Sequence, residues 1–277
     1  MTSTIALLTD FGTQDTYVSA MKGVIMSLNP QVRIVDITHH IPRGNIQRAA
    51  FELWRVQDYF PEGTIFLCVV DPGVGTVRRG LAISCGKRTY VGPDNGLFTY
   101  VHLLSERCTA VELHNPELML TNVSRTFHGR DVFAPAAAHL SRGVALDAFG
   151  PQVTDVAHFP LPLLRSIDDV EILGEVLHAD QFGNIITSIG MLEFATPDLV
   201  LQPWLPEVPA IRLPHEHIRL HLPGPLSLRL NRTFDEVPVG EAVAYIGSAG
   251  LLEIGINQGS ADDTLGLTPG QQISLTA

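Results

Sequence analysis

An almost uninterrupted apolar run at residues 64–70 (TIFLCVV) constrains the fold of this chain more than any other segment. A strand with apolar side chains on both faces belongs in the centre of a sheet that helices cover on both sides. A second such run lies at residues 4–9, and between the two runs residues 17–28 and 46–54 have the apolar periodicity of helices. Strands that alternate with helices predict an α/β N-terminal domain with a mainly parallel sheet.

The pattern changes after residue 157. Residues 158–169 are rich in proline and leucine, which is typical of a linker between domains. Beyond them Gly or Pro separates strand-length segments, and helical periodicity is scarce, so the second half predicts a smaller all-β domain that resembles a barrel. The predicted organisation is therefore an α/β domain at 1–157, a linker at 158–169 and a β-barrel-like domain at 170–277.

Charge and hydropathy exclude several classes of partner. Charged residues make up only 17% of the chain and the net charge is −11 with histidine neutral, whereas binding to nucleic-acid phosphates needs a basic face. No apolar stretch approaches the ~20 residues of a membrane span. The first residues lack the basic segment of a signal peptide, so we expect a cytoplasmic protein that binds neither nucleic acid nor membrane.

The three cysteines, Cys68, Cys85 and Cys108, are widely spaced and set among apolar residues. This pattern favours buried thiols, with metal or redox use as the alternative. The sequence therefore predicts three buried thiols.

Polar segments follow the two apolar strands. Asp10 comes directly after the first and Asp71 directly after the second, and residues 126–131 (TFHGRD) lead into a helix. In α/β folds ligands bind at the carboxyl ends of the strands, so these segments are candidates for one site. Each also has a purely structural explanation, because Asp and Gly form turns and Asp131 is a suitable helix N-cap. That explanation does not account for His128 beside two carboxylates.

Several common catalytic motifs are missing from the sequence. Gly73 and Gly75 lack the third glycine of a dinucleotide fingerprint, and no phosphate-binding G-x-x-x-x-G-K-[ST] motif occurs. His39 and His40 suggest a metal, but adjacent residues of a strand point to opposite faces, and no H-E-x-x-H or C-x-x-C motif supports them. A serine hydrolase would need a G-x-S-x-G motif. We therefore predict a site without metal or cofactor.

Six motifs in order do resemble a known family, the S-adenosylmethionine hydroxide adenosyltransferases, which hydrolyse S-adenosylmethionine and are related to the fluorinase and chlorinase enzymes. The similarity extends from Ile5 to Gly259, nearly the whole chain. The motifs are TDFG at 9–12, VDPGVGT at 70–76, VGPDNGL at 91–97, FHGRD at 127–131, DQFGN at 180–184 and GSAGLLEI at 247–254.

The resemblance implies an α/β domain, a β-barrel domain and a homotrimer with its sites at subunit interfaces. It also implies a catalytic set beside the attacking water, which falls on Asp71, Arg78 and His128 of this sequence. Arg79 is the adjacent alternative to Arg78 and is expected to be a surface charge. The halogenating relatives replace this set, so its presence here favours water over halide.

The resemblance further implies contacts to a small-molecule substrate. Asp10 matches the carboxylate that binds the ribose diol, and Phe11 and Asp15 belong to the same segment. The methionine and adenine parts and the amino-acid end of the substrate correspond to a second group: Asp180, Phe182, Asn184 and Ser248. Relatives often have a stacking aromatic residue before the second helix, whereas residues 42–46 (PRGNI) contain none.

The expected reaction is in-line attack of water on the ribose C5′, with methionine leaving as a neutral thioether. The leaving thioether needs no general acid, so catalysis has to activate the attacking water. His128 or Asp71 would take or orient the proton of that water, and Arg78 would stabilise its hydroxide character. Three alternatives remain: a halide-using transferase, a non-catalytic sensor of S-adenosylmethionine or adenosine, and a structural protein whose motifs only shape turns.

Overall fold

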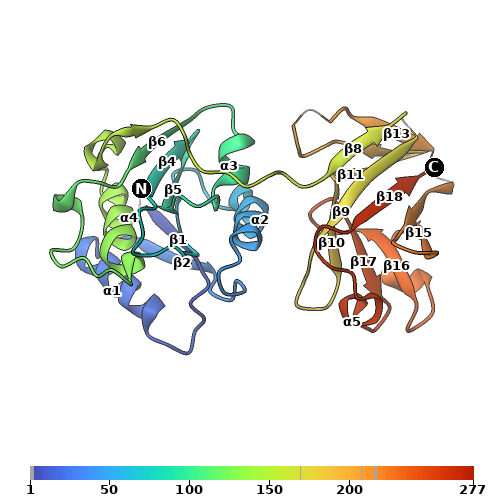
Figure 1. The fold of residues 1–277 in the computed structure, drawn as a ribbon, viewed down its shortest axis with the longest axis horizontal. Helices are drawn as coiled ribbons and strands as arrows, with labels where there is room; N and C mark the ends of the chain where they lie inside the picture. Colours follow the sequence, from blue (N-terminus) through green and yellow to red (C-terminus); the bar gives the residue numbers. More distant parts are fainter. Residues whose placement is uncertain (1–2, 169, 207, 215–216) are drawn as a thin grey trace. The chain divides into compact units, whose positions relative to one another are not determined.

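The computed structural model describes residues 3–168, 170–206, 208–214 and 217–277. The chain divides into two compact units, Met1–Phe159 and Pro160–Ala277 (Figure 1), and each is described by itself. Residues 1 and 2 of the predicted first domain and residue 169 at the end of the predicted linker lie outside the described residues. No helix in the described ranges has the length and hydropathy to cross a membrane.

The first unit is built on a sheet whose described strands follow the order β2-β1-β3-β5-β4-β6-β7. Its buried centre, β1 and β3, corresponds to the two apolar runs of the sequence. The strands are β1(Thr4–Thr9), β2(Arg33–Thr38), β3(Ile65–Val69), β4(Gly80–Cys85), β5(Arg88–Pro93), β6(Cys108–Glu112) and β7(Gln152–Val153).

The sheet is mixed, so the prediction of a mainly parallel sheet is not confirmed. β1 pairs in parallel with β2 and β3, and β3 with β5, but β4 is antiparallel to β5 and β6, and β6 is antiparallel to β7. The reason is the connection between β4 and β5, which is only Gly86-Lys87, with Gly86 at φ 59°. Two residues close a hairpin, whereas a parallel pair needs a crossover of a dozen or more.

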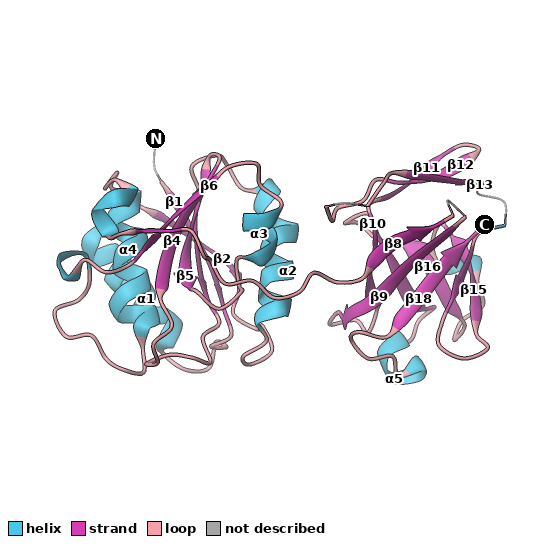
Figure 2. Ribbon diagram, turned by 45° about the horizontal axis from the view of Figure 1, so that its top comes forward, coloured by secondary structure: helices cyan, strands magenta, loops and turns pink. Residues whose placement is uncertain are grey.

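Helices cover both faces of this sheet (Figure 2). Ile5 and Leu7 of β1 pack with α1 and α4, whereas Ala6 and Leu8 pack with α2 on the opposite face, as the alternation of a strand requires. The helices are α1(Tyr17–Leu28), α2(Ile46–Val56), α3(Thr99–Leu103) and α4(Ala134–Ser141), with a π-helical turn η3(Gly129–Phe133) before α4 and 3-10 turns η1(Gln57–Tyr59), η2(Pro116–Leu118) and η4(Leu146–Phe149).

The second unit contains a closed barrel, as the sequence predicts. Its described strands run in the order β10-β17-β16-β15-β14-β18-β9, and pairing of β10 with β9 closes the ring. The barrel strands are β9(Glu171–Ala179), β10(Ile185–Gly190), β14(Arg219–His221), β15(Ser227–Asn231), β16(Ala242–Ile246), β17(Leu251–Ile256) and β18(Gln272–Thr276). β8(Leu164–Ile167) extends the barrel sheet at the edge beside β9. A separate sheet consists of β11(Leu192–Ala195), β12(Asp198–Leu201) and β13(Ile211–Pro214). Two short helices, η6(Phe234–Glu236) and α5(Ala261–Leu265), also lie in this unit.

The sequence predicted three buried thiols, but the structure has one buried thiol and one disulfide. Cys85 and Cys108, which are register partners in β4 and β6, form a disulfide, and Cys68 of β3 is a buried thiol. Burial raises the pKa of the Cys68 thiol well above its usual range. The bridge could not be predicted from the cysteine spacing, because the two residues lie opposite each other only after β4 and β6 pair.

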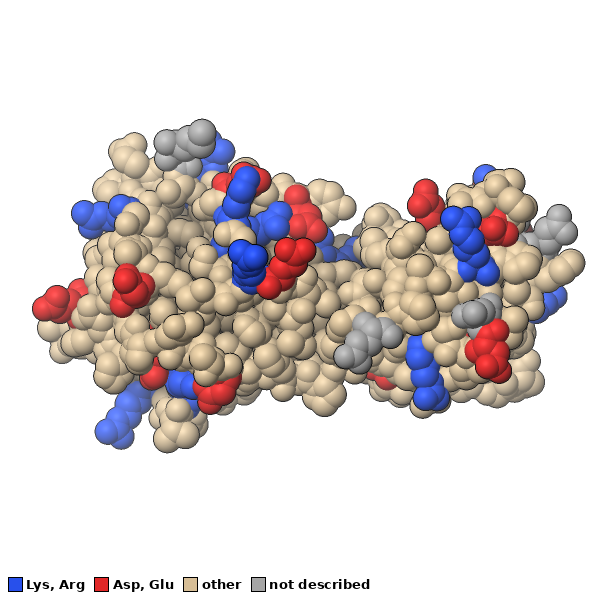
Figure 3. Space-filling view, turned by 90° about the horizontal axis from the view of Figure 1, so that it is seen from above, with Lys and Arg blue, Asp and Glu red and all other residues tan. Residues whose placement is uncertain are grey.

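Charged side chains on the face drawn in Figure 3 are sparse and of mixed sign. Most of that face is uncharged, and the described lysines and arginines lie singly or beside acidic residues. This distribution agrees with the low charged fraction of 17%.

Candidate active site

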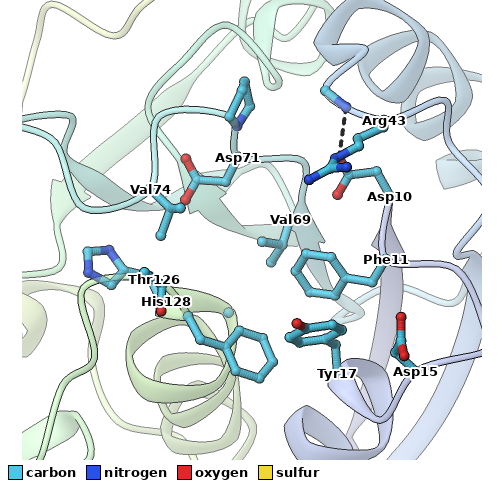
Figure 4. Close-up of a pocket in the computed structure, with 14 residues that line it drawn as sticks. Asp10, Phe11, Asp15, Tyr17, Arg43, Val69, Asp71, Val74, Thr126 and His128 are labelled. Atoms are coloured by element: carbon cyan, nitrogen blue, oxygen red, sulfur yellow. Dashed lines mark hydrogen bonds between the residues drawn. The ribbon is translucent and has the colours of Figure 1, made fainter.

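A pocket of about 570 Å³ opens in the first unit where β1 and β3 end (Figure 4). Asp10 follows β1, Asp71 follows β3, and His128 precedes the π-helical turn that leads into α4. All three side chains line the pocket, as do Phe11 and Asp15. The structure thus brings together these five predicted site residues, which come from three separate segments of the sequence.

Arg78 links two of the predicted catalytic residues. Its Nε donates to Asp71 Oδ1 at 2.9 Å and its Nη2 to Asp71 Oδ2 at 2.5 Å. The same Nη2 lies 2.7 Å from His128 Nδ1. The guanidinium carbon also lies 5.1 Å from the centre of the Phe133 ring. A bidentate pair of this kind fixes both partners, so the three side chains form one connected group.

The loop between Asp71 and Arg78 depends on Gly75. Its φ is 78°, and a Cβ atom there would lie 2.2 Å from the carbonyl oxygen of Arg125. The loop is further held by Thr76, whose hydroxyl donates to the Gly73 carbonyl at 2.7 Å. Only glycine allows this approach between the two loops that carry Asp71 and His128.

The electrostatics favour a neutral His128. Burial lowers the pKa of His128 below its usual value of 6.5, and the charge of Arg78 lowers this pKa further, against the opposing effects of Asp71 and Asp131. Because a guanidinium only donates hydrogen bonds, His128 Nδ1 is the acceptor in this contact. This assignment, made from the hydrogen-bond network, leaves the proton of the neutral ring on Nε2.

Asp10 is held at the other end of the pocket by backbone. Its Oδ2 accepts from the Gly44 N–H at 2.8 Å, and Gly44 has a φ of 70°. The preceding Thr9 bonds to His39 Nδ1 at 2.9 Å, and the His39 carbonyl accepts from the Gly12 N–H at 2.7 Å. The loop after β1 therefore has fixed geometry, and Asp10 lines the pocket from it.

His39 is a buried residue of this scaffold. Its Nε2 lies 3.1 Å from Asp36 Oδ1, and Asp36 Oδ2 accepts from Lys22 at 2.6 Å. In the described part of the chain no group of three or more His, Cys, Asp or Glu side chains is arranged to hold a metal ion.

Arg79 is partly exposed and forms two ion pairs outside the catalytic group. Its Nε donates to Asp94 Oδ2 and its Nη1 to Asp155 Oδ1, both at 2.8 Å, and these bonds raise the pKa of Arg79. Asp94 also accepts from the backbone N–H of Ala157 at 2.8 Å. The two adjacent arginines therefore serve different groups, and Arg78 is the one that contacts Asp71.

The remaining predicted site residues belong to the second unit. Asp180, Phe182 and Asn184 lie in the turn between β9 and β10, and Ser248 is exposed in the turn between β16 and β17. Asp180 Oδ1 accepts from the N–H groups of Phe182 and Asn184 at 2.8 and 2.9 Å, and Oδ2 accepts from Asn184 Nδ2 at 3.1 Å. Phe182 is 71% exposed, so the turn presents its ring to solvent.

The pocket is also lined by residues that the sequence interpretation did not single out, among them Tyr17, Arg43 and Phe127. Phe127 stands within the FHGRD motif, and Arg43 stands in the segment that lacks the expected aromatic residue. Tyr17 had no signal other than its position at the start of a predicted helix.

The fold and the pocket define a two-domain protein, α/β followed by β-barrel, with a site of small-molecule size. The chain belongs to the SAM hydroxide adenosyltransferase family: the N-terminal domain of that family matches residues 5–150 and the C-terminal domain residues 174–274. This match confirms the resemblance predicted from the six motifs.

Individual relatives cover nearly the whole chain. The (R)-S-adenosyl-L-methionine hydrolase of Thermus thermophilus is 42% identical over 98% of this chain and 98% of its own length. The fluorinase of Nocardia brasiliensis is 28% identical over 92% of this chain and 91% of its own. The structure of an uncharacterised conserved protein from Thermotoga maritima superposes with a TM-score of 0.84 at 32% identity, over 99% of this chain and 100% of that one.

Proposed function

We propose that this chain hydrolyses (R)-S-adenosyl-L-methionine to adenosine and L-methionine without a metal ion. The observation that carries the proposal is the contact of Arg78 with both Asp71 and His128 at a pocket. The 42% identity to a protein named as this hydrolase supports the substrate and the (R) configuration at sulfur. Water supplies the oxygen bonded to C5′, the C5′–S bond breaks with its electron pair going to sulfur, and one proton is released.

The chemistry suits these side chains because the leaving thioether is neutral. Catalysis therefore needs an oriented water molecule and a proton acceptor. With Nδ1 accepting from Arg78, neutral His128 donates from Nε2 to the oxygen of the water. Asp71 then takes the proton, since an ionised carboxylate has lone pairs beyond those that Arg78 occupies. Arg78 holds the Asp71 carboxylate in place through two hydrogen bonds and stabilises negative charge on the water oxygen.

Substrate binding extends the proposal to both units. Asp10 accepts the ribose hydroxyls, with Phe11 and Asp15 beside it. We assign the methionine and adenine contacts to four residues of the second unit: Asp180, Phe182, Asn184 and Ser248. We further propose a cytoplasmic homotrimer with its sites at subunit interfaces, for which light scattering would give three times the 30.2 kDa chain mass.

The test is chromatography of (R)-S-adenosyl-L-methionine incubated with the purified protein. We expect adenosine and methionine in equal amounts, at a rate that neither chloride nor EDTA changes. His128→Ala and Arg78→Ala should lower kcat at least ~100-fold, as loss of a positioned proton-transfer or charge-stabilising group does. Arg79→Lys is the matched control, because Arg79 contacts Asp94 and Asp155 and not the catalytic group.

Three outcomes would contradict the proposal. Tight binding without turnover would identify a sensor of S-adenosylmethionine. Turnover that requires halide would identify a transferase like the fluorinase relatives. Absence of binding would leave the polar segments with only their structural explanation. A thermal melt of each variant separates loss of catalysis from loss of fold.

A further inference from the structure

Three aromatic rings form one wall of the pocket. Phe11 lies in the loop after β1, Tyr17 is the first residue of α1, and Phe127 precedes His128. The ring centres are 5.7 Å apart for Phe11 and Tyr17, 5.8 Å for Phe11 and Phe127, and 5.1 Å for Tyr17 and Phe127. Figure 4 shows Phe11 and Tyr17 together, with Asp15 on one side and His128 on the other.

The wall is closely packed around Gly129. A Cβ atom at Gly129 would lie 3.2 Å from Phe127 Cε2, 3.4 Å from Phe11 Cε2 and 3.3 Å from the sulfur of Met21. These contacts are tighter than ordinary van der Waals distance, so a side chain here would displace the rings. Phe11 and Phe127 also pack against the hydrophobic core of the first unit, so two of the three rings are supported by the core.

Tyr17 is the ring with the most open surface. The residue is 49% exposed although it lines a pocket, so the core does not require it. The guanidinium of Arg130 already lies 5.1 Å from the ring centre of Phe127. Across the described residues no lysine or arginine is found over Phe11 or Tyr17, which leaves those rings available to a cation.

We propose that Phe11 and Tyr17, which both pack against Phe127, bind the sulfonium group of the substrate, with Tyr17 as the main contact. The inference rests on the proposed function. A sulfonium carries positive charge but no N–H or O–H group, so it cannot donate a hydrogen bond to the carboxylates of the pocket. The faces of aromatic rings attract such cations, as they attract quaternary ammonium groups. The wall thus selects S-alkylated sulfonium nucleosides over neutral thioethers.

The contact should act on binding more than on the chemical step. The charge on sulfur disperses as the C5′–S bond breaks, so the rings stabilise the bound substrate more than the transition state. Removing the Tyr17 ring is therefore expected to raise KM without lowering kcat. The methionine product is a neutral thioether, so the attraction also ends with the reaction.

The test compares a charged and a neutral ligand at equilibrium. Binding of (R)-S-adenosyl-L-methionine and of S-adenosyl-L-homocysteine is measured by calorimetry in a His128→Ala background, in which turnover is expected to be at least ~100-fold slower. Tyr17→Leu should weaken sulfonium binding by roughly 2- to 30-fold, the range that a cation–π contact spans, and leave thioether binding unchanged. Tyr17→Phe, which keeps the ring, should keep the wild-type preference.

If Tyr17→Leu weakens the binding of both ligands equally, the wall acts by shape alone and the inference is overturned. If the substitution weakens the binding of neither ligand, the wall does not contribute and the inference is also overturned. The protein with an unsubstituted aromatic wall provides a second test. Its affinity for (R)-S-adenosyl-L-methionine is compared with its affinity for S-adenosyl-L-homocysteine. Hydrolysis without a preference for the sulfonium overturns the inference and leaves the proposed function intact. Preference without hydrolysis supports the wall and overturns the function, and absence of all binding overturns both.

Discussion

A single nitrogen of Arg78 serves two acceptors, Asp71 Oδ2 at 2.5 Å and His128 Nδ1 at 2.7 Å. A guanidinium stays protonated at any pH that a protein tolerates. Protonation of His128 would therefore set an N–H of the imidazolium against an N–H of Arg78. The pair therefore favours the neutral histidine, and burial, the larger effect, lowers the pKa of His128 in the same direction.

The pH dependence follows from this arrangement. Because burial and Arg78 lower its pKa below the usual value, His128 is mainly neutral at neutral pH, and we expect kcat/KM to be level there and to fall at acid pH. Stability should fall in the same acid window, since the unfolded chain then binds more protons than the folded one. Proton NMR of the His128 ring gives the pKa directly, and Arg78→Gln should raise it. A midpoint above 6.5 in the wild type would contradict the assignment.

The site residues that the sequence identified lie at strand ends or in a motif, whereas the position of a missed residue depends on packing. Asp10 and Asp71 were predictable because they directly follow apolar strands, and the ends of neighbouring strands meet. His128 came from a motif. Tyr17 was not predictable, because the first residue of an amphipathic helix can point to solvent, to the core or into a pocket, and only the packed structure distinguishes these.

At the scale of elements, two loops of the site approach each other so closely that one of them requires glycine. Gly75 has a φ of 78° and a Cβ there would lie 2.2 Å from the Arg125 carbonyl oxygen, whereas Gly63 has a φ of 80° with nothing within 4 Å. At both positions a residue with a side chain would be strained by the positive φ. Only at Gly75 would its Cβ also clash with backbone.

Gly75→Ala and Gly63→Ala therefore form a matched pair. We expect Gly63→Ala to lower the stability by about 1 kcal/mol through backbone strain and to leave kcat unchanged. Gly75→Ala should lower stability further and reduce kcat, because the loop that carries Asp71 and Arg78 has to move. Thermal melts and steady-state kinetics of both variants test this. Equal effects of the two substitutions would mean that the close approach to Arg125 is unimportant.

Element types were easier to predict than their pairing. The apolar stripe at 46–54 predicted α2, and Ala49, Ala50 and Leu53 are buried in it. The direction of β4 against β5 was not predicted, because it depends on a two-residue connection and not on the apolar pattern of either strand. Closure of the barrel was predicted from many short strands between turn residues.

For the molecule as a whole, the disulfide bears on the proposed location. Cys85 and Cys108 are bridged across a sequence separation of 23 residues, whereas cytoplasmic thiols are normally kept reduced. A bridge over a loop of this length contributes about 3 kcal/mol in the chain-entropy model. The oxidised and reduced chains therefore differ in stability, while the pocket residues contact neither cysteine in the described hydrogen bonds and ring contacts.

Thiol counting tests the bridge. Alkylation of the unfolded, non-reduced chain should modify one cysteine, Cys68, and prior reduction should make all three reactive. The double variant Cys85→Ser/Cys108→Ser should show one thiol in both conditions and melt about 5–10 °C lower than the oxidised chain. Three reactive thiols without reduction, in protein purified in air, would mean that the bridge does not form.

The ion pair of Arg78 and Asp71 also restricts how this protein can evolve. The two side chains are only 11% and 5% exposed, and loss of one partner of a buried pair typically costs about 3–5 kcal/mol. A descendant that replaced Asp71 alone would keep an uncompensated cation, and one that replaced Arg78 alone would keep an uncompensated anion. Mutations at the two positions are therefore epistatic: each is deleterious unless the other is already present. A lineage moving from water to another nucleophile must cross that fitness valley or first gain stability elsewhere.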